Sequence, residues 1–482
     1  MLKWFLIIAL CAYGILMVRT IRFILLEKGS PSRTLAWIAF LFLLPILGLM
    51  LYYVFGKNIR QKNIFRRKRL ETERIFEAFE KLQSQHDPHI EKGLPPKQKR
   101  YRKLIRMVMK NQQTVWTIGN QTKVFHDGHT FFEALFEDLK NAQKHIAIQF
   151  YIFEEGQLAD RLLEILKRKV QEGVSVKVIY DGVGSWNLSD RFIKLVKSAG
   201  IELYPFIPLR FFKWPQRINY RNHRKIVVID SEIGYTGGFN IADKYLLGDP
   251  VLGYWRDTHV RIAGPAVLGL WLVFLLDWHF VSGHSVHLES NMFQIAKETK
   301  GCPIQIIASG PDSNIANIQH LYFSMINLAK RYIYISTPYF IPDESILTAL
   351  KTAALSNVDV QLMIPYNSDT KLLKWSIRSY LEELLEVGVK VFFYQNGFMH
   401  SKVLIADDIV SSIGTANMDE RSFSQNFEVN AIIYDKTICK EVKNQFLSDL
   451  KLCEEIHAVS FKNRPRKEKA MESIARLFSP LI

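Results

Sequence analysis

Two segments of the sequence repeat one spacing of a histidine, a lysine and an aspartate, a combination suited to phosphodiester chemistry. They are His223-x-Lys225-x4-Asp230 and His400-x-Lys402-x4-Asp407. A neutral imidazole can attack phosphorus while a second, protonated imidazole protonates the leaving oxygen. Because the pKa of histidine lies near neutral pH, the two copies can hold opposite protonation states. The lysines would stabilise charge on the non-bridging oxygens, so we expect a reaction that requires no metal and no other cofactor.

Each motif is followed by a loop of small residues that ends in an asparagine. The loops are Gly237-Gly238-Phe239-Asn240 and Gly414-Thr415-Ala416-Asn417. We expect the amides of Asn240 and Asn417 and the hydroxyl of Thr415 to bind the phosphate. Gly238 stands where the second copy has Thr415, so the two copies are chemically unequal. One motif alone would also fit a strand with a surface lysine, but two copies at equivalent places indicate one shared pocket.

Four acidic residues are candidates for roles beside the histidines. Asp230 and Asp407 close the motifs and are included with the catalytic residues, although their place at a strand end also suits binding of a backbone turn. A histidine base usually has a separate acid that fixes its tautomer. Glu428 and Asp257 lie on comparable later strands and are candidates for that role, with a surface or turn acid as the alternative.

The segments that must position these residues form an internal repeat of alternating strands and helices. The first copy consists of the predicted elements 145–153, 158–170, 174–180, 190–198, 201–204 and 225–230. The second consists of 332–340, 345–354, 358–364, 373–385, 389–394 and 402–406. This order is typical of an α/β sandwich on a mostly parallel sheet. Since side chains alternate along a strand, the histidine and lysine of each motif should share a face. Two pseudo-symmetric halves, 113–285 and 300–482, would then meet at the pocket.

Length and charge narrow the class of partner. At 482 residues with 48% hydrophobic content, the chain can form two or three folded domains. Its net charge of +16 favours a polyanion, either nucleic acid or an anionic lipid surface. The four cysteines are scattered and do not have the spacing of a zinc site. We therefore expect most of the chain in a reducing compartment.

Two apolar runs near the N-terminus favour the lipid surface. Trp4 to Val18 is uninterrupted, and Leu35 to Phe55 carries no charge. A signal peptide is the alternative for the first run, but a second run follows at once. Residues 1–56 should therefore form a two-helix transmembrane hairpin, and the lysines and arginines after it place the larger C-terminal part in the cytoplasm. Residues 57–112 should form a basic linker, either along an anionic membrane face or as a solvated connector.

Two further segments are candidates for membrane contact. Residues 209–217 interleave aromatic and basic side chains, and we expect Phe211, Phe212 and Trp214 to enter the interface beside the pocket. A buried core loop is the alternative. The apolar run 266–281 is too short for a span and contains Asp277, so core packing and interfacial insertion both fit it.

The paired motifs and their asparagine loops resemble the phospholipase D superfamily, and within it the bacterial cardiolipin synthases. The resemblance extends to Ser30–Trp37 between the apolar runs, Gly310–Asp312, Tyr339–Pro342 and a C-terminal Arg476–Leu481. It implies two phospholipase-D-like halves and transfer of a phosphatidyl group through a phosphohistidine. Phosphatidylglycerol would be both donor and acceptor, glycerol would be released, and cardiolipin would form at the cell membrane.

The same resemblance suggests roles for individual residues. It implies that His223 is the nucleophile and His400 the general acid and base. It also favours Glu428 as the partner of His400, because their separation resembles that in single-domain relatives. No nucleic-acid partner is expected, and the sequence does not indicate an oligomeric state.

Three other functions fit some of these features. A nuclease or hydrolase of the same superfamily would suit the basic charge, although the apolar N-terminus argues against a nuclease. Another phosphatidyltransferase, with a serine or ethanolamine acceptor, would use the same motifs. A lipid-binding scaffold with an inactive site is the non-enzymatic alternative, and the two intact motifs argue against it.

Overall fold

The structure is a computed structural model that describes residues 2–26, 31–55, 65, 68, 99–112, 116–208, 219–284, 301–313 and 315–479. The chain divides into two compact units. Met1–Arg67 and Arg210–Asn219 form the first, which we call the N-terminal unit. Lys68–Leu209 and Tyr220–Ile482 form the second, which we call the catalytic unit because it contains both motifs.

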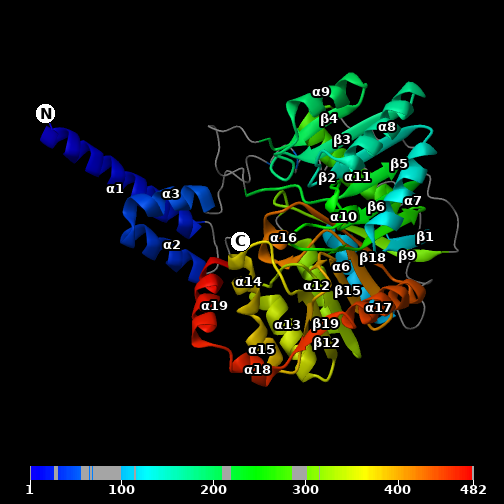
Figure 1. Cartoon of the computed structure of the whole chain (residues 1–482). Coiled ribbons are helices and arrows are strands. Elements are labelled where there is room, and N and C mark those ends of the chain that lie inside the picture. Colours follow the sequence, from blue (N-terminus) through cyan, green and yellow to red (C-terminus); the bar gives the residue numbers. More distant parts are fainter. Residues whose placement is uncertain are drawn as a thin grey trace. The chain divides into compact units, whose positions relative to one another are not determined.

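A single 15-stranded sheet runs through both halves of the catalytic unit (Figure 1). Its first-half strands are β1 (Thr117–Phe125), β2 (His145–Phe150), β3 (Ser175–Asp181), β4 (Glu202–Phe206), β5 (Ile226–Ile229), β6 (Ile233–Gly237) and β8 (His259–Ala263). Its second-half strands are β9 (Cys302–Ser309), β10 (Tyr332–Ser336), β12 (Asp359–Pro365), β13 (Lys390–Tyr394), β15 (Val403–Ala406), β16 (Val410–Gly414), β18 (Glu428–Ile433) and β19 (Cys453–Ile456). The order is β19-β13-β12-β10-β15-β16-β18-β9-β1-β8-β6-β5-β2-β3-β4. Apart from β19 it reads the same repeat outward from the antiparallel β1–β9 pair, which therefore marks the pseudo-twofold junction.

Helices cover both faces of this sheet. The first half contributes α7 (Gly128–Lys140), α8 (Gln157–Gln171), α9 (Asp190–Ser198), α10 (Lys244–Leu247) and α11 (Val267–Ser282). The second contributes α12 (Asn317–Leu328), α13 (Glu344–Leu355), α14 (Lys371–Arg378), α15 (Leu381–Leu385), α16 (Glu420–Ser424) and α17 (Lys436–Leu450). The flanking helices are η1 (Lys99–Tyr101), α6 (Arg102–Gln112), α18 (Ala458–Lys462) and α19 (Arg466–Phe478).

Alternation along the central strands assigns each helix layer to a face. Ile146 and Ile148 of β2 pack into one apolar cluster with α7, α8 and α9, whereas Gln149 donates to Asp277 of α11 on the opposite face. In the second half Ile333 of β10 packs in the cluster formed with α12 and α13, and the ring of Tyr334 stacks on Phe446 of α17. Each half is therefore a three-layer α/β/α sandwich.

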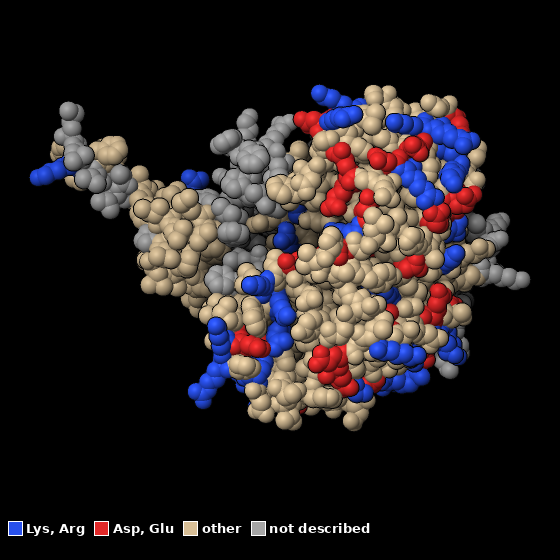
Figure 2. Space-filling view, viewed as in Figure 1, with Lys and Arg blue, Asp and Glu red and all other residues tan. Residues whose placement is uncertain are grey.

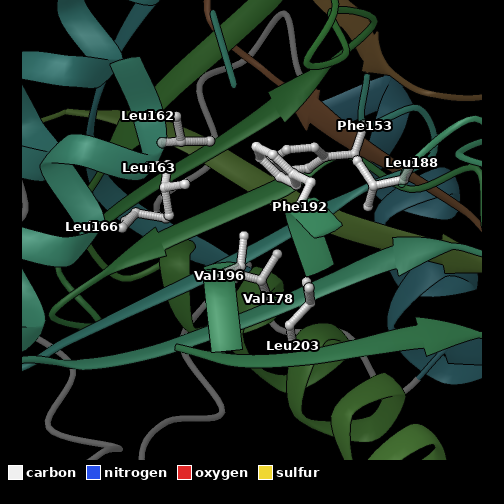
Figure 3. Close-up of a pocket in the computed structure, with 9 residues that line it drawn as sticks. All are labelled: Phe153, Leu162, Leu163, Leu166, Val178, Leu188, Phe192, Val196 and Leu203. Atoms are coloured by element: carbon white, nitrogen blue, oxygen red, sulfur yellow. The ribbon is translucent and has the colours of Figure 1, made fainter. Parts of the chain in front are cut away.

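The core of the first half is dry and apolar where α8 and α9 meet β3 and β4. Figure 3 shows Leu162, Leu163 and Leu166 of α8 converging with Phe192 and Val196 of α9 on the sheet. The gap between them is about 10 Å³ and no polar side chain lines it. A space of that size and character does not hold a bound water, so this cavity is a packing gap and not a binding site.

Three expectations about these elements are corrected by the structure. The sheet is mixed and not mostly parallel, because among its described strands only β2-β3-β4 and β10-β12-β13 run parallel. Strands β5 and β15 begin after the motif lysines, so each histidine and lysine precedes its strand. The helix predicted over 373–385 is two helices, α14 and α15, separated at Ser379 and Tyr380.

The apolar run 266–281 forms α11, a core helix whose charged residue is fully paired. Val267, Leu270 and Phe274 are buried, as is most of the helix. Asp277 is 0% exposed and accepts both Nη1 hydrogen bonds of Arg224, at 2.7 and 2.8 Å, while Lys68 Nζ lies 3.1 Å from it. Arg224 stands between His223 and Lys225, so this buried ion pair fixes the backbone of the first motif. Of the two alternatives for this run, the structure supports core packing.

Among its described residues, the N-terminal unit has the helices α1 (Leu2–Leu26), α2 (Pro31–Leu43) and α3 (Pro45–Phe55). The predicted single helix over Leu35–Phe55 is therefore wrong, since Pro45 has no N–H to continue α2. Gly48 approaches the backbone of Phe40, and the rings of Trp37 and Tyr52 meet edge to face at 5.3 Å, so α3 folds back on α2. No helix in the described part of the chain has both the length and the apolar character required to cross a membrane.

The two motif aspartates tie the end of one strand to the start of its neighbour. The Asp230 carboxylate accepts backbone N–H groups of Gln143, Lys144 and His145 at 2.7–2.9 Å, ahead of β2. Asp407 accepts those of residues 330–332 in the same way, ahead of β10. Both aspartates have positive φ, 54° and 57°, a conformation that aspartate tolerates better than most residues. They close equivalent turns in the two halves.

We expect Asp230→Ala to lower the free energy of unfolding by about 2 kcal/mol, because three N–H groups lose their acceptor. Burial alone would raise the pKa of Asp230, but those three hydrogen bonds outweigh it and lower the pKa. The stabilisation is therefore present at neutral pH and lost as the pH falls through the folded pKa. Denaturant unfolding between pH 7 and pH 3 measures both effects, with the exposed Glu232→Ala as the control. Equal stability of the two variants at pH 7 would contradict this role.

Candidate active site

Each motif histidine is held by backbone of the opposite half. The His223 N–H donates to the carbonyl of Phe427 at 2.9 Å, and the His400 N–H donates to that of Arg256 at 2.7 Å. The second contact extends a short parallel pair of β7 (Trp255–Arg256) and β14 (Phe398–Met399). The two halves thus exchange equivalent segments, and the exchange brings both histidines to one place.

Both rings line a single cavity of about 610 Å³. The other lining side chains come from both halves and include Tyr151, Asn240, Tyr245, Trp255, Tyr339, Asn417 and Asp419. His223 is 8% and His400 6% exposed, so the imidazoles are accessible only through this cavity. A space of this size suits a small-molecule headgroup.

The two predicted acids lie against the histidines, and the pairing is crossed between the halves. Both carboxylate oxygens of Glu428 lie 3.0 Å from Nδ1 of His223. Asp257 Oδ2 lies 2.5 Å from Nδ1 of His400. The predicted assignment of Glu428 to His400 is therefore wrong. The physical reason is that Glu428 directly follows Phe427, whose carbonyl accepts the His223 N–H. Asp257 likewise directly follows Arg256, whose carbonyl accepts the His400 N–H.

A carboxylate that accepts a hydrogen bond from Nδ1–H leaves Nε2 as the ring nitrogen with a lone pair. Burial lowers the pKa of His223 to about 4, against the opposing charge of Glu428. It also lowers the pKa of His400 well below its usual range, helped by the charges of Lys402 and Lys225. Both imidazoles are consequently neutral in the empty cavity at pH 7, and an anionic phosphodiester would restore the proton that a general acid needs.

The pKa values of the two acids shift in opposite directions. Burial raises the pKa of Asp257, and the charge of Lys402 only partly offsets this. Burial also acts on Glu428, but the contacts with His223, Lys225 and Thr415 outweigh it and lower the pKa of that carboxyl. Glu428 is therefore the more strongly anionic partner.

The motif lysines are buried behind the histidines. Lys225 Nζ donates to the carbonyl of His223 at 2.9 Å, and Lys402 Nζ donates to that of His400. Burial lowers the pKa of Lys225 to about 7 and that of Lys402 to about 8, although the two acids raise them partly back. Two cations so close to deprotonation favour an anionic ligand, which would restore their full charge.

The asparagines of the two loops lie at the cavity. Asn240 accepts the N–H of Ile152 at 3.0 Å and donates to the Tyr245 hydroxyl at 2.8 Å. Asn240 and Asn417 both line the cavity, where phosphate contact was predicted.

Thr415 does not reach the cavity, so its predicted contact with phosphate is wrong. Its hydroxyl is 0% exposed and donates to Glu428 Oε2 at 2.6 Å, which makes it a support for that acid. In the first half a Cβ at Gly238 would overlap the carboxylate of Asp257. The difference between Gly238 and Thr415 thus follows the size of the acid that each must accommodate.

The structure places the motif aspartates away from the cavity that the two histidines line. Asp230 and Asp407 lie at the far ends of β5 and β15 and are not among the cavity-lining residues. Their carboxylates bind turns, which supports the structural alternative, and their inclusion among the catalytic residues stays a prediction. Phe211, Phe212 and Trp214 lie outside the described residues.

Comparisons with known proteins agree with this geometry. A family model described as "Cardiolipin synthase, PLD-like domain" matches residues 135–250 and 322–450, and one described as "Phospholipase_D-nuclease N-terminal" matches 12–57. A protein named cardiolipin synthase from Geobacillus thermodenitrificans (strain NG80-2) is 42% identical over 461 residues, 95% of this chain and 90% of that one. The chain belongs to the cardiolipin synthase family. Another member, from Halalkalibacterium halodurans, is 41% identical over 476 residues, 98% of this chain and 94% of its own.

A solved structure supports the fold of this cardiolipin synthase family member. Phosphatidylserine synthase from Haemophilus influenzae Rd KW20 superposes with a TM-score of 0.61 at 14% identity. The match covers 79% of this chain and 97% of that one. At this identity the likeness concerns the fold alone.

The lysine and the arginine that line the cavity of this family member are not predicted from the sequence. Lys244 and Arg421 line the cavity beside the histidines. Each stands four residues after a loop asparagine, Asn240 or Asn417. That shared offset within the repeat was the available signal.

We expect Glu428→Gln to lower kcat by about 10²–10⁴-fold, since an amide cannot stabilise the charged imidazole or fix its tautomer. Initial rates on phospholipid vesicles measure the effect, with thermal unfolding to establish that the fold is kept. Asp257→Asn should behave similarly, and the exposed Glu455→Gln is the control. A Glu428→Gln enzyme within threefold of the control would show that the carboxylate does not orient His223.

Proposed function

We propose that this cavity transfers a phosphatidyl group from one phosphatidylglycerol to another, releasing glycerol and forming cardiolipin. The observation that carries the proposal is the crossed arrangement of two imidazoles, each with its own buried carboxylate, around one cavity. Membership of the cardiolipin synthase family supports the choice of substrate.

In the first step His223 Nε2 attacks phosphorus, an N–P bond forms and the P–O bond to glycerol breaks. His400, protonated once the anionic lipid is bound, gives its proton to the departing glycerol oxygen. In the second step neutral His400 takes the proton of an incoming hydroxyl, the new P–O bond forms and the N–P bond breaks. Lys225, Lys402 and the two loop asparagines would stabilise the phosphoryl oxygens in both steps.

The unequal acids support His223 as the nucleophile. Glu428 is held anionic by its contacts, so it can stabilise the positive charge that appears on His223 when the N–P bond forms. Asp257 has a raised pKa, which suits an imidazole that repeatedly gains and loses a proton. The distinction between the halves is therefore electrostatic.

A nucleic-acid substrate is less consistent with the surface. A nuclease groove requires a continuous basic stripe. Figure 2 shows lysine and arginine side chains intermixed with aspartate and glutamate over this face of the catalytic unit. A lipid substrate requires positive charge at the cavity, where Lys244 and Arg421 line the wall and Lys225 and Lys402 are buried behind the histidines.

The proposed function includes attachment of the N-terminal unit to the membrane. Large apolar side chains on α1 are exposed, among them Trp4, Phe5 and Ile15 at 70–71%. The match of residues 12–57 to an N-terminal family model supports a shared role for this segment. The multi-pass topology with a cytoplasmic catalytic unit remains a prediction.

Phosphohistidine trapping tests the nucleophile. With phosphatidylglycerol labelled at phosphorus, His400→Ala should accumulate label on the protein, because the acid–base group needed for release is missing. His223→Ala should stay unlabelled, and both variants should lose more than about 10³-fold in turnover. Peptide mapping should locate the label at residue 223.

The products test the reaction itself. Wild-type protein with phosphatidylglycerol should release one glycerol for each cardiolipin formed. Phosphatidic acid as the sole product would overturn the transferase, and label at His400 would overturn only the assignment of the nucleophile.

Cysteine labelling tests the topology. In a chain whose native cysteines are replaced by serine, Gly29→Cys should react with an impermeant maleimide in intact cells, and Lys57→Cys should react only after lysis. Reaction of neither residue in intact cells would indicate attachment without two spans.

A further inference from the structure

Two cations outside the motifs line the active-site cavity. Lys244 begins α10 and Arg421 lies in the first turn of α16, at equivalent places in the two halves. The motif lysines are deeper: Lys225 is 0% and Lys402 1% exposed, and both donate to histidine carbonyls. The site therefore has an inner pair of cations, Lys225 and Lys402, behind the histidines, and an outer pair, Lys244 and Arg421, on the cavity wall.

The outer cations are crossed between the halves in the same way as the acids. Lys244 Nζ lies 4.5 Å from the ring centroid of Trp255, whose ring lies 5.5 Å from that of His400. Arg421 lines the cavity together with Tyr151, whose ring lies 4.9 Å from that of His223; burial raises the pKa of Tyr151, and the charge of Arg421 partly offsets this. Each histidine thus has an outer cation beyond a neighbouring aromatic ring, contributed by the other half.

The second step of the proposed reaction needs two phosphates in this cavity at once. One is the phosphoryl group on His223, whose negative charge is balanced by the motif lysines Lys225 and Lys402. The other belongs to the incoming phosphatidylglycerol, does not react, and is separated from the attacking hydroxyl by a single glycerol. Two anions this close repel each other in a buried site unless a further cation is present.

On the assumption of the proposed function, we propose that Lys244 binds the phosphate of the acceptor phosphatidylglycerol. The acceptor hydroxyl must reach His400, which takes its proton, and Lys244 is the outer cation beside His400. A phosphate held there points its glycerol hydroxyl toward the phosphohistidine. Arg421, beside His223, belongs to the donor side.

The surface beside Lys244 suits a lipid more than a free phosphate. Leu247, in the same helix, is 68% exposed, and Val251, which also lines the cavity, is 86% exposed. Apolar side chains next to a cation match the boundary between a lipid phosphate and its acyl chains. The cavity can therefore distinguish an anionic lipid acceptor from glycerol or water.

The test compares two acceptors that react with the same phosphohistidine. Cardiolipin formation uses an anionic acceptor, whereas exchange of labelled glycerol into phosphatidylglycerol uses a neutral one. We expect Lys244→Ala to lower cardiolipin formation at least about tenfold more than glycerol exchange, because only the former loses a charged contact. The acceptor KM should rise, and phosphatidic acid should increase as water competes. Lys244→Arg should restore most of the ratio.

Arg421→Ala is the matched variant. It should lower cardiolipin formation and glycerol exchange together and leave their ratio unchanged. A change of ratio in Arg421→Ala and not in Lys244→Ala would overturn the assignment of the acceptor side. Equal losses of both activities in Lys244→Ala would show that Lys244 does not select the acceptor. Absence of both cardiolipin formation and glycerol exchange in the wild type would instead refute the proposed function.

Discussion

The contacts between each histidine and a carboxylate from the other half are the constraint on which the catalytic unit depends. A buried acid and a buried imidazole are costly apart, and each is compensated only when the two halves are joined. Neither half on its own holds a paired histidine, because Glu428 faces His223 and Asp257 faces His400. The antiparallel β1–β9 pair serves the same end, as does Arg224, which donates to the carbonyls of Glu428 and Ser309 in the second half.

The same junction explains how groups with ordinary acid–base properties become useful. Burial makes both imidazoles neutral and brings both motif lysines close to losing their protons. An anionic phosphodiester reverses these shifts, so substrate binding itself assembles the charged catalytic groups.

Much of this arrangement could be predicted from the sequence, because the repeat preserves spacing. The histidines and loop asparagines line one cavity, with both acids against the histidines and the motif lysines behind them, as the second copy of the motif indicates. Partner identity could not be predicted, since spacing along the chain does not reveal that Glu428 crosses to His223. The motif alone predicts that the Thr415 hydroxyl binds phosphate, because the spacing does not show that Glu428 lies beside it and accepts its hydrogen bond. Hydrophobicity alone predicts one helix over Leu35–Phe55, whereas the chain breaks between α2 and α3 at Pro45.

Gly238 bears on whether one half of the chain could replace the other. The two halves share their architecture, yet a threonine at 238 would overlap Asp257, whereas Thr415 supports the longer Glu428. Each acid and its facing residue are therefore matched in size as a pair, and Gly238 and Asp257 belong to the half opposite the histidine that they serve. A protein assembled from two identical halves would have to use one of these solutions twice. The present chain uses both solutions, one in each half, so its halves are not interchangeable.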